Sequence, residues 1–316
     1  MTVCQLYAKQ IRHRGNVRYN TKNGRKRLMK LLEEDKLGGC PIDSVKLSDA
    51  KEWAIRMKEK GISYKTISND KRSLKAAFYT AIQDDCIRKN PFDFQLNTVI
   101  EDDTEPKVPL TPAQEESFLS FAQNDKVYQK YYDELIILLG TGLRISELCG
   151  LTDTDINFEN RIINVDHQLL RSAETGYYIE TPKTKSGIRQ IPMSEKVYEA
   201  FNRVLKRRRG AKAVTIDGYS NFLFLNRDGY PKTATNYDGM FRGHAKKYNK
   251  YHEEALPKVM TPHTLRHTFC TNMANAGMNP KALQYITGHS NITMTLNYYA
   301  HATFDSAKAE MLRIAA

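Results

Sequence analysis

An acidic stretch with two prolines separates two parts of this chain that differ in character. Residues 101–109 read EDDTEPKVP, and four of these nine side chains are acidic. Proline lacks the amide donor of regular structure, and so polar a stretch has little to bury. We therefore expect a linker at 101–109 between a domain at 1–100 and a second domain at 110–316. The 316 residues suffice for two cores of ordinary size.

The first domain carries two helical patterns. Residues 48–60 open with Ser and Asp, which can cap a helix, and they place Trp53 and Met57 on one face. Residues 63–87 carry apolar side chains at helical spacing, among them Phe78. An all-α bundle with one basic side is the simplest account of this domain.

The positive charge of the chain is concentrated in this domain. The net charge is +12, and residues 1–100 hold 21 Lys and Arg against 11 Asp and Glu, a difference of +10. Such an excess favours nucleic acid as the partner, because each neutralised phosphate releases counterions. A solvated basic surface is the alternative. The candidate DNA contacts are Arg25, Lys26, Lys65, Lys71 and Arg72.

The second domain mixes helices with strands. Helical patterns are expected at 131–139, 194–209, 233–252, 262–276, 279–287 and 292–300, with a last amphipathic segment at about 303–316. The runs RIINVDHQ, GYYIET and GIRQIPM predict a small antiparallel sheet, and NFLFLN is a further strand candidate. The expected fold class is therefore two-domain and mainly α, with a helical bundle followed by an α+β domain.

Cysteine usage and hydropathy indicate the compartment. The five cysteines are scattered without a CxxC pair, which fits a reducing cytoplasm. The first residues lack the apolar core of a signal peptide, and the longest apolar run, LIILLGTGL, is too short for a bilayer. We expect a cytoplasmic protein without membrane contact.

Two arginines lie in motifs that suit phosphate binding. Arg144 lies in TGLRISELCGL, after Gly140 and Gly142, which are expected to break an apolar helix. Arg266 lies in TPHTLRHTF three residues after His263, so both share a helix face. A guanidinium can bind two oxygens of one phosphate. An arginine such as Arg144, taken alone, is more often part of a surface ion pair.

A metal site is the competing interpretation of the second motif. His263 and His267 have the spacing of a helical metal pair, but the glutamate of that motif is missing and Arg266 would put a cation beside the metal. Two-metal phosphate chemistry needs clustered carboxylates, and these motifs offer only Glu147. We expect no metal and no cofactor, and a packing or supporting role for His267.

A lysine pair and a tyrosine pair complete the candidates. Lys183 and Lys185 lie at an expected hairpin turn, where a lysine could protonate a leaving-group oxygen. Tyr298 and Tyr299 follow His289 in TGHSNITMTLNYYAH. On a helix that starts at 292, Tyr299 falls on the apolar stripe and Tyr298 lies about 100° away. We therefore expect Tyr299 to pack and Tyr298 to face a ligand.

Together these motifs resemble the tyrosine recombinases, the phage-integrase-type recombinases. They match in order from about 140 to 300, and their wording is most similar to integrases of conjugative transposons of Gram-positive bacteria. The matching residues are Arg144, Lys185, His263, Arg266, His289 and Tyr298. The resemblance selects Lys185 over Lys183, because the family lysine often precedes a small residue and a glycine at the turn.

The resemblance implies an enzyme that cuts and rejoins DNA through a 3′-phosphotyrosine, for integration and excision of a mobile element. Tyr298 would be the nucleophile, and the covalent link stores the bond energy without ATP or metal. Arg144 and Arg266 would stabilise the charge on the phosphorane. Lys185 would be the general acid.

Three further roles are implied. His263 would assist proton transfer from the tyrosine, whose unperturbed pKa of about 10 is high for a nucleophile at neutral pH. His289 would hydrogen-bond the phosphate. Glu147 matches an acidic position that would hold an active-site cation in place.

The partners are implied in the same way. Residues 1–100 would be the core-binding domain, acting on double-stranded DNA at recombination core sites in the bacterial cytoplasm, at the nucleoid. Copies of the chain would form a dimer to tetramer and exchange the tail at about 303–316, and an excisionase is a further partner. Integrases of this type usually carry a further N-terminal domain that binds arm sites, but here the core-binding pattern begins close to the first residue. We therefore expect either a shortened protein or a member of a simpler subgroup.

Two other functions compete with this interpretation. A type IB topoisomerase uses similar residues, but the amphipathic segment after the tyrosines argues against it. A DNA-binding regulator without activity needs no tyrosine in this place, so the complete catalytic set argues against that function too.

Overall fold

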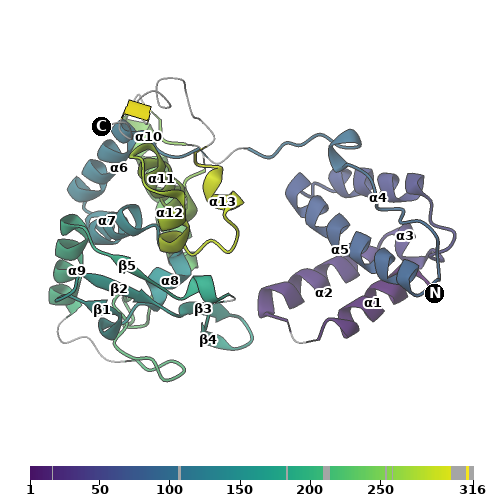
Figure 1. Cartoon of the computed structure of the whole chain (residues 1–316), viewed down its shortest axis with the longest axis horizontal. Coiled ribbons are helices and arrows are strands. Elements are labelled where there is room, and N and C mark those ends of the chain that lie inside the picture. Colours follow the sequence, from purple (N-terminus) through teal and green to yellow (C-terminus); the bar gives the residue numbers. More distant parts are fainter. Residues whose placement is uncertain are drawn as a thin grey trace. The chain divides into compact units, whose positions relative to one another are not determined.

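The computed structural model describes residues 1–15, 17–105, 108–182, 184–208, 214–252, 255–257, 259–299 and 311–312. The chain forms two compact units, Met1–Pro106 and Lys107–Ala316, each with its own core (Figure 1). The expected fold class is confirmed, because the chain is mainly helical and its short strands all lie in the second unit. Apart from 311–312, the expected tail helix lies outside the described residues.

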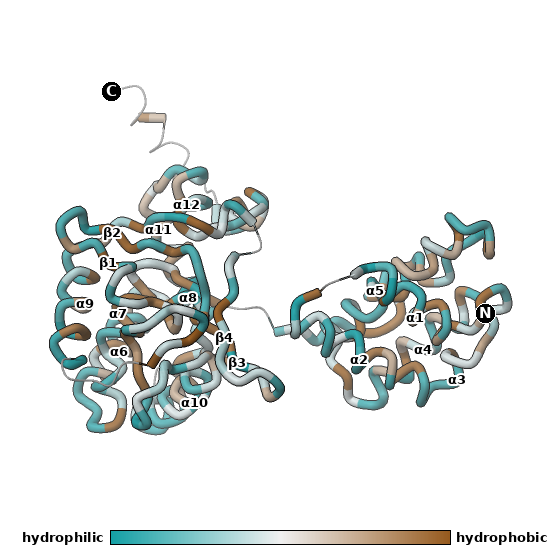
Figure 2. Tube along the Cα trace, turned by 90° about the horizontal axis from the view of Figure 1, so that it is seen from below, coloured by the Kyte–Doolittle hydropathy of each residue, from teal (hydrophilic) through white to brown (hydrophobic). Residues whose placement is uncertain are grey.

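The first unit is a helical bundle. Its helices are α1 (Val3–His13), α2 (Tyr19–Glu33), α3 (Lys36–Gly39), α4 (Leu47–Glu59) and α5 (Tyr64–Gln83), followed by a 3₁₀ turn at Leu96–Thr98. The ring of Phe92 lies at the centre of its core, 5.8 Å from Trp53 and 5.3 Å from Phe78 between centroids. Figure 2 shows apolar residues on the inward faces of these helices.

Two helix ends in this unit differ from the expected ones. The N-cap of α4 is Lys46, whose amide donates to the Asp49 carboxylate at 2.8 Å, so the expected cap at Ser48 is wrong. The carboxylate comes from inside the first turn, which shifts the start of the helix. Helix α5 begins after Ser63 but ends at Gln83, four residues before the expected end.

The second unit surrounds α7 with helices and two small sheets. Its helices are α6 (Pro112–Asn124), α7 (Tyr132–Thr141), α8 (Ile145–Gly150), α9 (Glu195–Arg208), α10 (Ala234–Tyr251), α11 (Pro262–Asn275), α12 (Pro280–Thr287) and α13 (Thr293–Leu296). Its strands are β1 (Ile156–Asn157), β2 (Ile162–Val165), β3 (Gln168–Ser172), β4 (Gly176–Glu180) and β5 (Arg189–Pro192). Its 3₁₀ turns are Gln129–Tyr131, Asp153–Asp155 and Lys185–Gly187. Helix α7 is apolar on nearly every side because α9 and α11 pack against it.

The strands form two antiparallel sheets where one was expected. The order of the first sheet is β1-β2-β5, with Ile163 opposite Ile191 and Val165 opposite Arg189. The run GYYIET does not join it. Strand β4 pairs instead with β3, its neighbour in the chain, through a tight turn that ends at Gly176 in the left-handed region (φ +72°). This local pairing separates the hairpin from the larger sheet.

Three further expectations about the second unit are wrong. The run NFLFLN makes only isolated bridges, at Phe222 and Leu225, and forms no strand. Gly140 does not break α7 but lies inside it, where a Cβ would come within 2.5 Å of Val197 on α9. The helix expected at 292–300 is the single turn α13, which ends at Leu296. After it, the amides of Tyr298 and Tyr299 donate to the carbonyls of Thr295 and Leu296, three residues back, so the chain continues as a tighter turn.

No helix in the described ranges combines the length and the apolar character that a membrane crossing needs.

A buried histidine links α10 to α6 in the core of the second unit. The ring of His244 lies 4.3 Å from Phe118, 5.1 Å from Phe121 and 4.9 Å from Tyr128 between centroids. Burial lowers the pKa of His244 to about 4, although the charge of Asp125 opposes the shift. The folded state therefore holds the neutral ring, whereas the unfolded chain takes up a proton as the pH falls below about 6.5.

Replacing this histidine should change how stability depends on pH. Because the folded pKa is depressed, the free energy of unfolding should fall as the pH drops from 7 to 5. His244→Leu should reduce that fall by about 1–2 kcal/mol. Urea denaturation followed by far-UV circular dichroism at both pH values measures the difference. Equal falls for the two proteins would contradict the buried neutral ring.

Candidate active site

The turn between α7 and α8 positions Arg144. Gly142 ends α7 in the left-handed region (φ +63°), where a Cβ would lie 2.4 Å from the ring of Phe269. A side chain would therefore be both strained and blocked here. Arg144 follows in the extended N-cap position of α8, and its amide donates to the Glu147 carboxylate at 2.8 Å.

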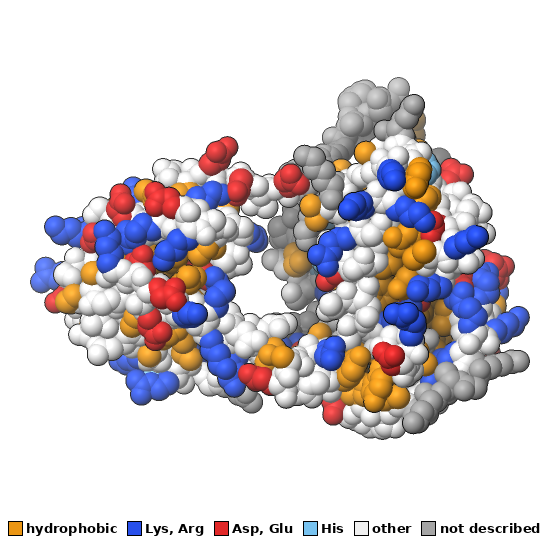
Figure 3. All heavy atoms as spheres, turned by 180° about the vertical axis from the view of Figure 1, so that it is seen from behind, with side chains coloured by type: hydrophobic (Ala, Val, Ile, Leu, Met, Phe, Trp, Pro, Cys, Tyr) orange, Lys and Arg blue, Asp and Glu red, His pale blue; other side chains and the backbone are white. Residues whose placement is uncertain are grey.

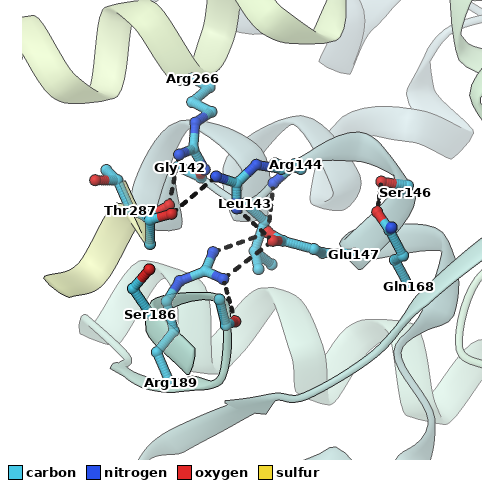
Figure 4. A network of polar contacts seen from close by, with 12 residues as sticks. Gly142, Leu143, Arg144, Ser146, Glu147, Gln168, Ser186, Arg189, Arg266 and Thr287 are labelled. Carbon is cyan, nitrogen blue, oxygen red and sulfur yellow. Dashed lines mark hydrogen bonds and ion pairs between the residues drawn. The ribbon is translucent and has the colours of Figure 1, made fainter. Parts of the chain in front are cut away.

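Glu147 holds two guanidinium groups from different parts of the chain. It accepts from Arg144 Nη1 at 2.7 Å, and from Arg189 Nη2 at 2.8 Å and Nη1 at 3.0 Å (Figure 4). Burial alone would raise the pKa of Glu147, but the hydrogen bonds and charge of Arg189 and the charge of Arg144 lower it to about 2. The carboxylate is therefore ionised at any pH near neutral.

Arg266 reaches the same place from α11. Its Nη1 donates to the carbonyl of Gly142 at 2.6 Å and its Nη2 to the carbonyl of Thr287 at 2.5 Å. Burial, and then the charge of Arg144, lower the pKa of Arg266 to about 10, so the group keeps its charge at neutral pH. Figure 4 shows Arg266 and Arg144 side by side, each above a carbonyl that fixes its direction.

His289 lies at the end of α12, next to these arginines. Gly288 ends the helix in the left-handed region (φ +64°), and its carbonyl accepts from Arg144 Nη2 at 3.0 Å. The ring of His289 is buried, with Nδ1 2.9 Å from the Thr295 hydroxyl. Burial, and then the charges of Arg266 and Arg144, lower the pKa of His289 to about 4. The ring is therefore neutral at pH 7.

Tyr298 lies in the turn after α13. Its ring is half-buried, 4.8 Å from His267 in an edge-on contact and 6.5 Å from His289 in a parallel one. It packs on the cluster that Phe269 and Cys270 form with α12. Burial, and then the neighbouring Cys270 thiol, raise the pKa of Tyr298 to about 12, while Arg266 lowers it. In the DNA-free protein the phenol is therefore protonated.

The helical argument that separated the two tyrosines is wrong in its geometry. Helix α13 ends before them, and both rings pack on the same cluster. The Tyr299 hydroxyl donates to the Met278 carbonyl at 2.5 Å, whereas a mostly apolar contact was expected. The two tyrosines nevertheless differ in their neighbours, because the Tyr298 ring lies against the rings of His267 and His289.

Two expected residues lie at the exposed edge of the site. Lys185 begins the 3₁₀ turn before β5, and its side chain is exposed. His263 is exposed in the first turn of α11, one turn before the buried Arg266. Lys183, the alternative to Lys185, lies outside the described residues.

Comparison with known proteins identifies the family. The family model described as the phage integrase family matches residues 109–306, which include every catalytic candidate. The chain belongs to the phage integrase family. It is a tyrosine recombinase, an enzyme that cuts and rejoins DNA at specific sites.

Two relatives place the recombinase more closely. The transposase from transposon Tn916 of Enterococcus faecalis is 68% identical over 314 residues, which cover 99% of this chain and 77% of that protein. A structure of the Tn1549 transposon integrase in complex with a circular intermediate DNA is 77% identical with a TM-score of 0.95, and 99% of each chain is covered. A lambda integrase dimer on a core site, 16% identical with a TM-score of 0.63 over 96% of this chain and 95% of that one, shares the fold.

Arg189 is the site residue that the sequence motifs missed. In β5 the burial alternates, so Arg189 and Ile191 face inward while Gln190 and Pro192 face outward. A cation on the inward face of a strand needs a buried partner, and this alternation was visible in the run RQIP. The partner, Glu147, is 42 residues away in the chain, so the contact itself could not be read locally.

The potential metal ligands that lie together are in another part of the second unit. In the described ranges, three potential ligands come together at Asp155, Asp166 and His167. That group does not include His263 or His267. Both ring nitrogens of His167 already face acceptors, at 2.6 Å from Asp166 and 2.8 Å from the Gly150 carbonyl.

The five expected DNA contacts of the first unit differ in exposure. The exposed ones are Lys26, Lys65 and Arg72, and Arg25 is half-buried. The Lys71 side chain already has partners within its own domain. Its Nζ donates to the Phe94 carbonyl at 2.5 Å and lies 4.4 Å from the centre of the Phe94 ring. Burial lowers the pKa of Lys71. Figure 3 shows Lys and Arg side chains spread over the visible face of each unit.

The close packing at Gly288 gives a test of the site. A Cβ there would lie 2.9 Å from the Ser186 carbonyl and 3.2 Å from the Arg189 side chain. Gly288→Ala should therefore push the lysine turn and Arg189 away and slow DNA cleavage by about tenfold or more. Gly277→Ala is the matched control, because Gly277 has a similar backbone (φ +77°) and open space around it. Single-turnover cleavage rates compare the two, and equal rates would contradict the packing account.

Proposed function

We propose that this recombinase integrates and excises a mobile element of the conjugative-transposon type by cutting DNA through a 3′-phosphotyrosine at Tyr298. The observation that carries the proposal is that Arg144, Arg266 and His289 lie together, with Arg266 and His289 next to Tyr298. The names of the relatives support the biological role, since one is a Tn916 transposase and another a Tn1549 integrase bound to transposon right end DNA.

The two arginines would bind the scissile phosphate. Each guanidinium already donates to backbone carbonyls that fix its direction, and each keeps further N–H donors for a phosphate. Arg266 remains charged at neutral pH because its lowered pKa of about 10 is still well above 7. Preset donors of this kind stabilise the charge that builds up on a pentacoordinate phosphorus.

The reaction would need one base and one acid. The Tyr298 oxygen would form a bond to phosphorus while the bond to the 5′ oxygen breaks, which leaves a 3′-phosphotyrosine and a free 5′-hydroxyl. Because the pKa of Tyr298 is about 12, its proton has to leave during the attack, and the exposed His263 would assist that transfer. Lys185 would protonate the 5′ oxygen.

His289 would act as a neutral hydrogen-bond partner of the phosphate. Its pKa of about 4 means that it carries no charge at pH 7. It therefore would not compete with Lys185 as the acid, nor with the arginines as a cation.

The proposed partners follow from the same role. Double-stranded DNA at the core sites would lie against the exposed Lys65, Arg72 and Lys26 of the first unit. The half-buried Arg25 would be a further contact and Lys71 a weaker one. Two to four copies would assemble on DNA and exchange the tail at about 303–316, with an excisionase to favour excision. The place of action would be the bacterial cytoplasm, at the nucleoid.

A covalent-adduct assay tests this function. The chain, incubated with a nicked DNA duplex that carries a relative's transposon end, should give an SDS-stable protein–DNA band. Tyr298→Phe should abolish the band while leaving DNA binding unchanged. Tyr299→Phe should keep it, because the change removes one hydrogen bond worth about 1 kcal/mol of stability. No band with the wild-type chain, or a band with Tyr298→Phe, would overturn the proposal.

A further inference from the structure

Arg189 is a buried cation that bonds to three separate segments of the site. The residue is 3% exposed, and its side chain lies on the inward face of β5. Two of its nitrogens donate to Glu147, its Nε donates to the Ile286 carbonyl at 2.6 Å, and Nη1 also reaches the Gly187 carbonyl at 3.1 Å. Four of the five N–H groups of a guanidinium can serve these contacts.

Each of these segments carries one part of the proposed chemistry. Glu147 holds Arg144, Gly187 ends the turn that Lys185 begins, and Ile286 lies three residues before His289. Figure 4 shows Arg189 beneath Glu147, with Ser186 of the lysine turn beside it. The Arg189 side chain therefore contacts the segments that position Arg144, Lys185 and His289.

We propose that Arg189 is a positioning residue for DNA cleavage, which keeps Glu147 ionised and aligned for Arg144 and fixes the lysine turn against the His289 turn. The inference rests on the proposed roles of Arg144 and Lys185. Arg189 would not touch the DNA, since its donors face the carboxylate and two carbonyls.

Stability alone is a poor explanation for this arrangement. Desolvating two charges can cost more than their attraction returns, and apolar replacements of buried ion pairs are often neutral or stabilising. What an apolar residue could not do is keep Glu147 charged. Glu147 faces Arg144 at the N-cap of its own helix, Arg189 on β5 and the charge of Arg266 on α11. Without Arg189, burial would favour a protonated carboxyl, which holds Arg144 less well.

The test is the single-turnover cleavage rate of Arg189→Gln as a function of pH. We expect cleavage at pH 7 to slow roughly 10- to 100-fold, as is usual when a residue that orients an active-site group through a hydrogen bond is lost. The affinity for DNA should not change. The loss should deepen as the pH falls, because the Glu147 carboxyl then protonates at a higher pH than in the wild type. Arg189→Lys should keep a pH profile like that of the wild type and cleave at an intermediate rate. Lysine retains the positive charge but cannot make the two parallel hydrogen bonds of a guanidinium to the Glu147 carboxylate.

A matched ion pair in the first unit controls for stability. Arg56 donates to Asp35 through Nε at 2.8 Å and Nη2 at 2.7 Å, again two contacts to a buried carboxylate. Arg56→Gln should lower the melting temperature without changing the pH profile of cleavage. The proposal is overturned if Arg189→Gln and Arg189→Lys both cleave within about threefold of the wild-type rate at every pH, because so small a change is typical of a surface substitution. It is also overturned if Arg56→Gln shifts the pH profile equally.

A double variant separates action through Glu147 from an independent effect. Arg189→Gln combined with Glu147→Gln should cleave no more slowly than the slower single variant, because both changes remove the same support of Arg144. If the losses in cleavage rate of the two single variants multiply in the double variant, Arg189 does not act through Glu147 and the proposal is overturned. Failure of the proposed function would look different, because the wild-type chain itself would then give no covalent adduct.

Discussion

The active site depends on one buried carboxylate. Glu147 bonds to Arg144 in the turn before its own helix and to Arg189 on a strand of the sheet. A buried carboxylate without partners would be neutral and would hold no cation. With both guanidinium groups present its pKa falls to about 2, so the cluster is ionised throughout the physiological range. The rest of the site is arranged around this fixed charge.

Backbone carbonyls at helix ends complete the arrangement. The ends of α7 and α12 supply the carbonyls of Gly142, Thr287 and Gly288 to Arg144 and Arg266. Both helices end at a glycine in the left-handed region, which brings their carbonyls to the surface of the site. The arginines are thus oriented without DNA, and in the proposed reaction little reorganisation would be needed when charge builds up on the phosphate.

The sequence motifs pointed to residues that the structure brings together, but they did not give the geometry of the site. Arg144, Arg266 and His289 were found from ordered motifs, and the structure brings them together. The geometry of Tyr298 was not predicted, because a short helix was assumed to continue through the tyrosines, whereas α13 ends at Leu296. The pairing of GYYIET was missed because the hydrophobic alternation of a strand does not say which partner it takes. Arg189 was missed because a motif search looks for groups that touch substrate, and its partner is distant in the chain.

The central claim is that the arginines are held in place before DNA arrives. Crystal structures of the free chain and of its Tyr298→Phe variant on DNA test it most directly. Both structures should show the same contacts, with Arg144 and Arg189 each within about 3.2 Å of Glu147. A free structure in which Arg144 has left Glu147, and returns only with DNA, would contradict it.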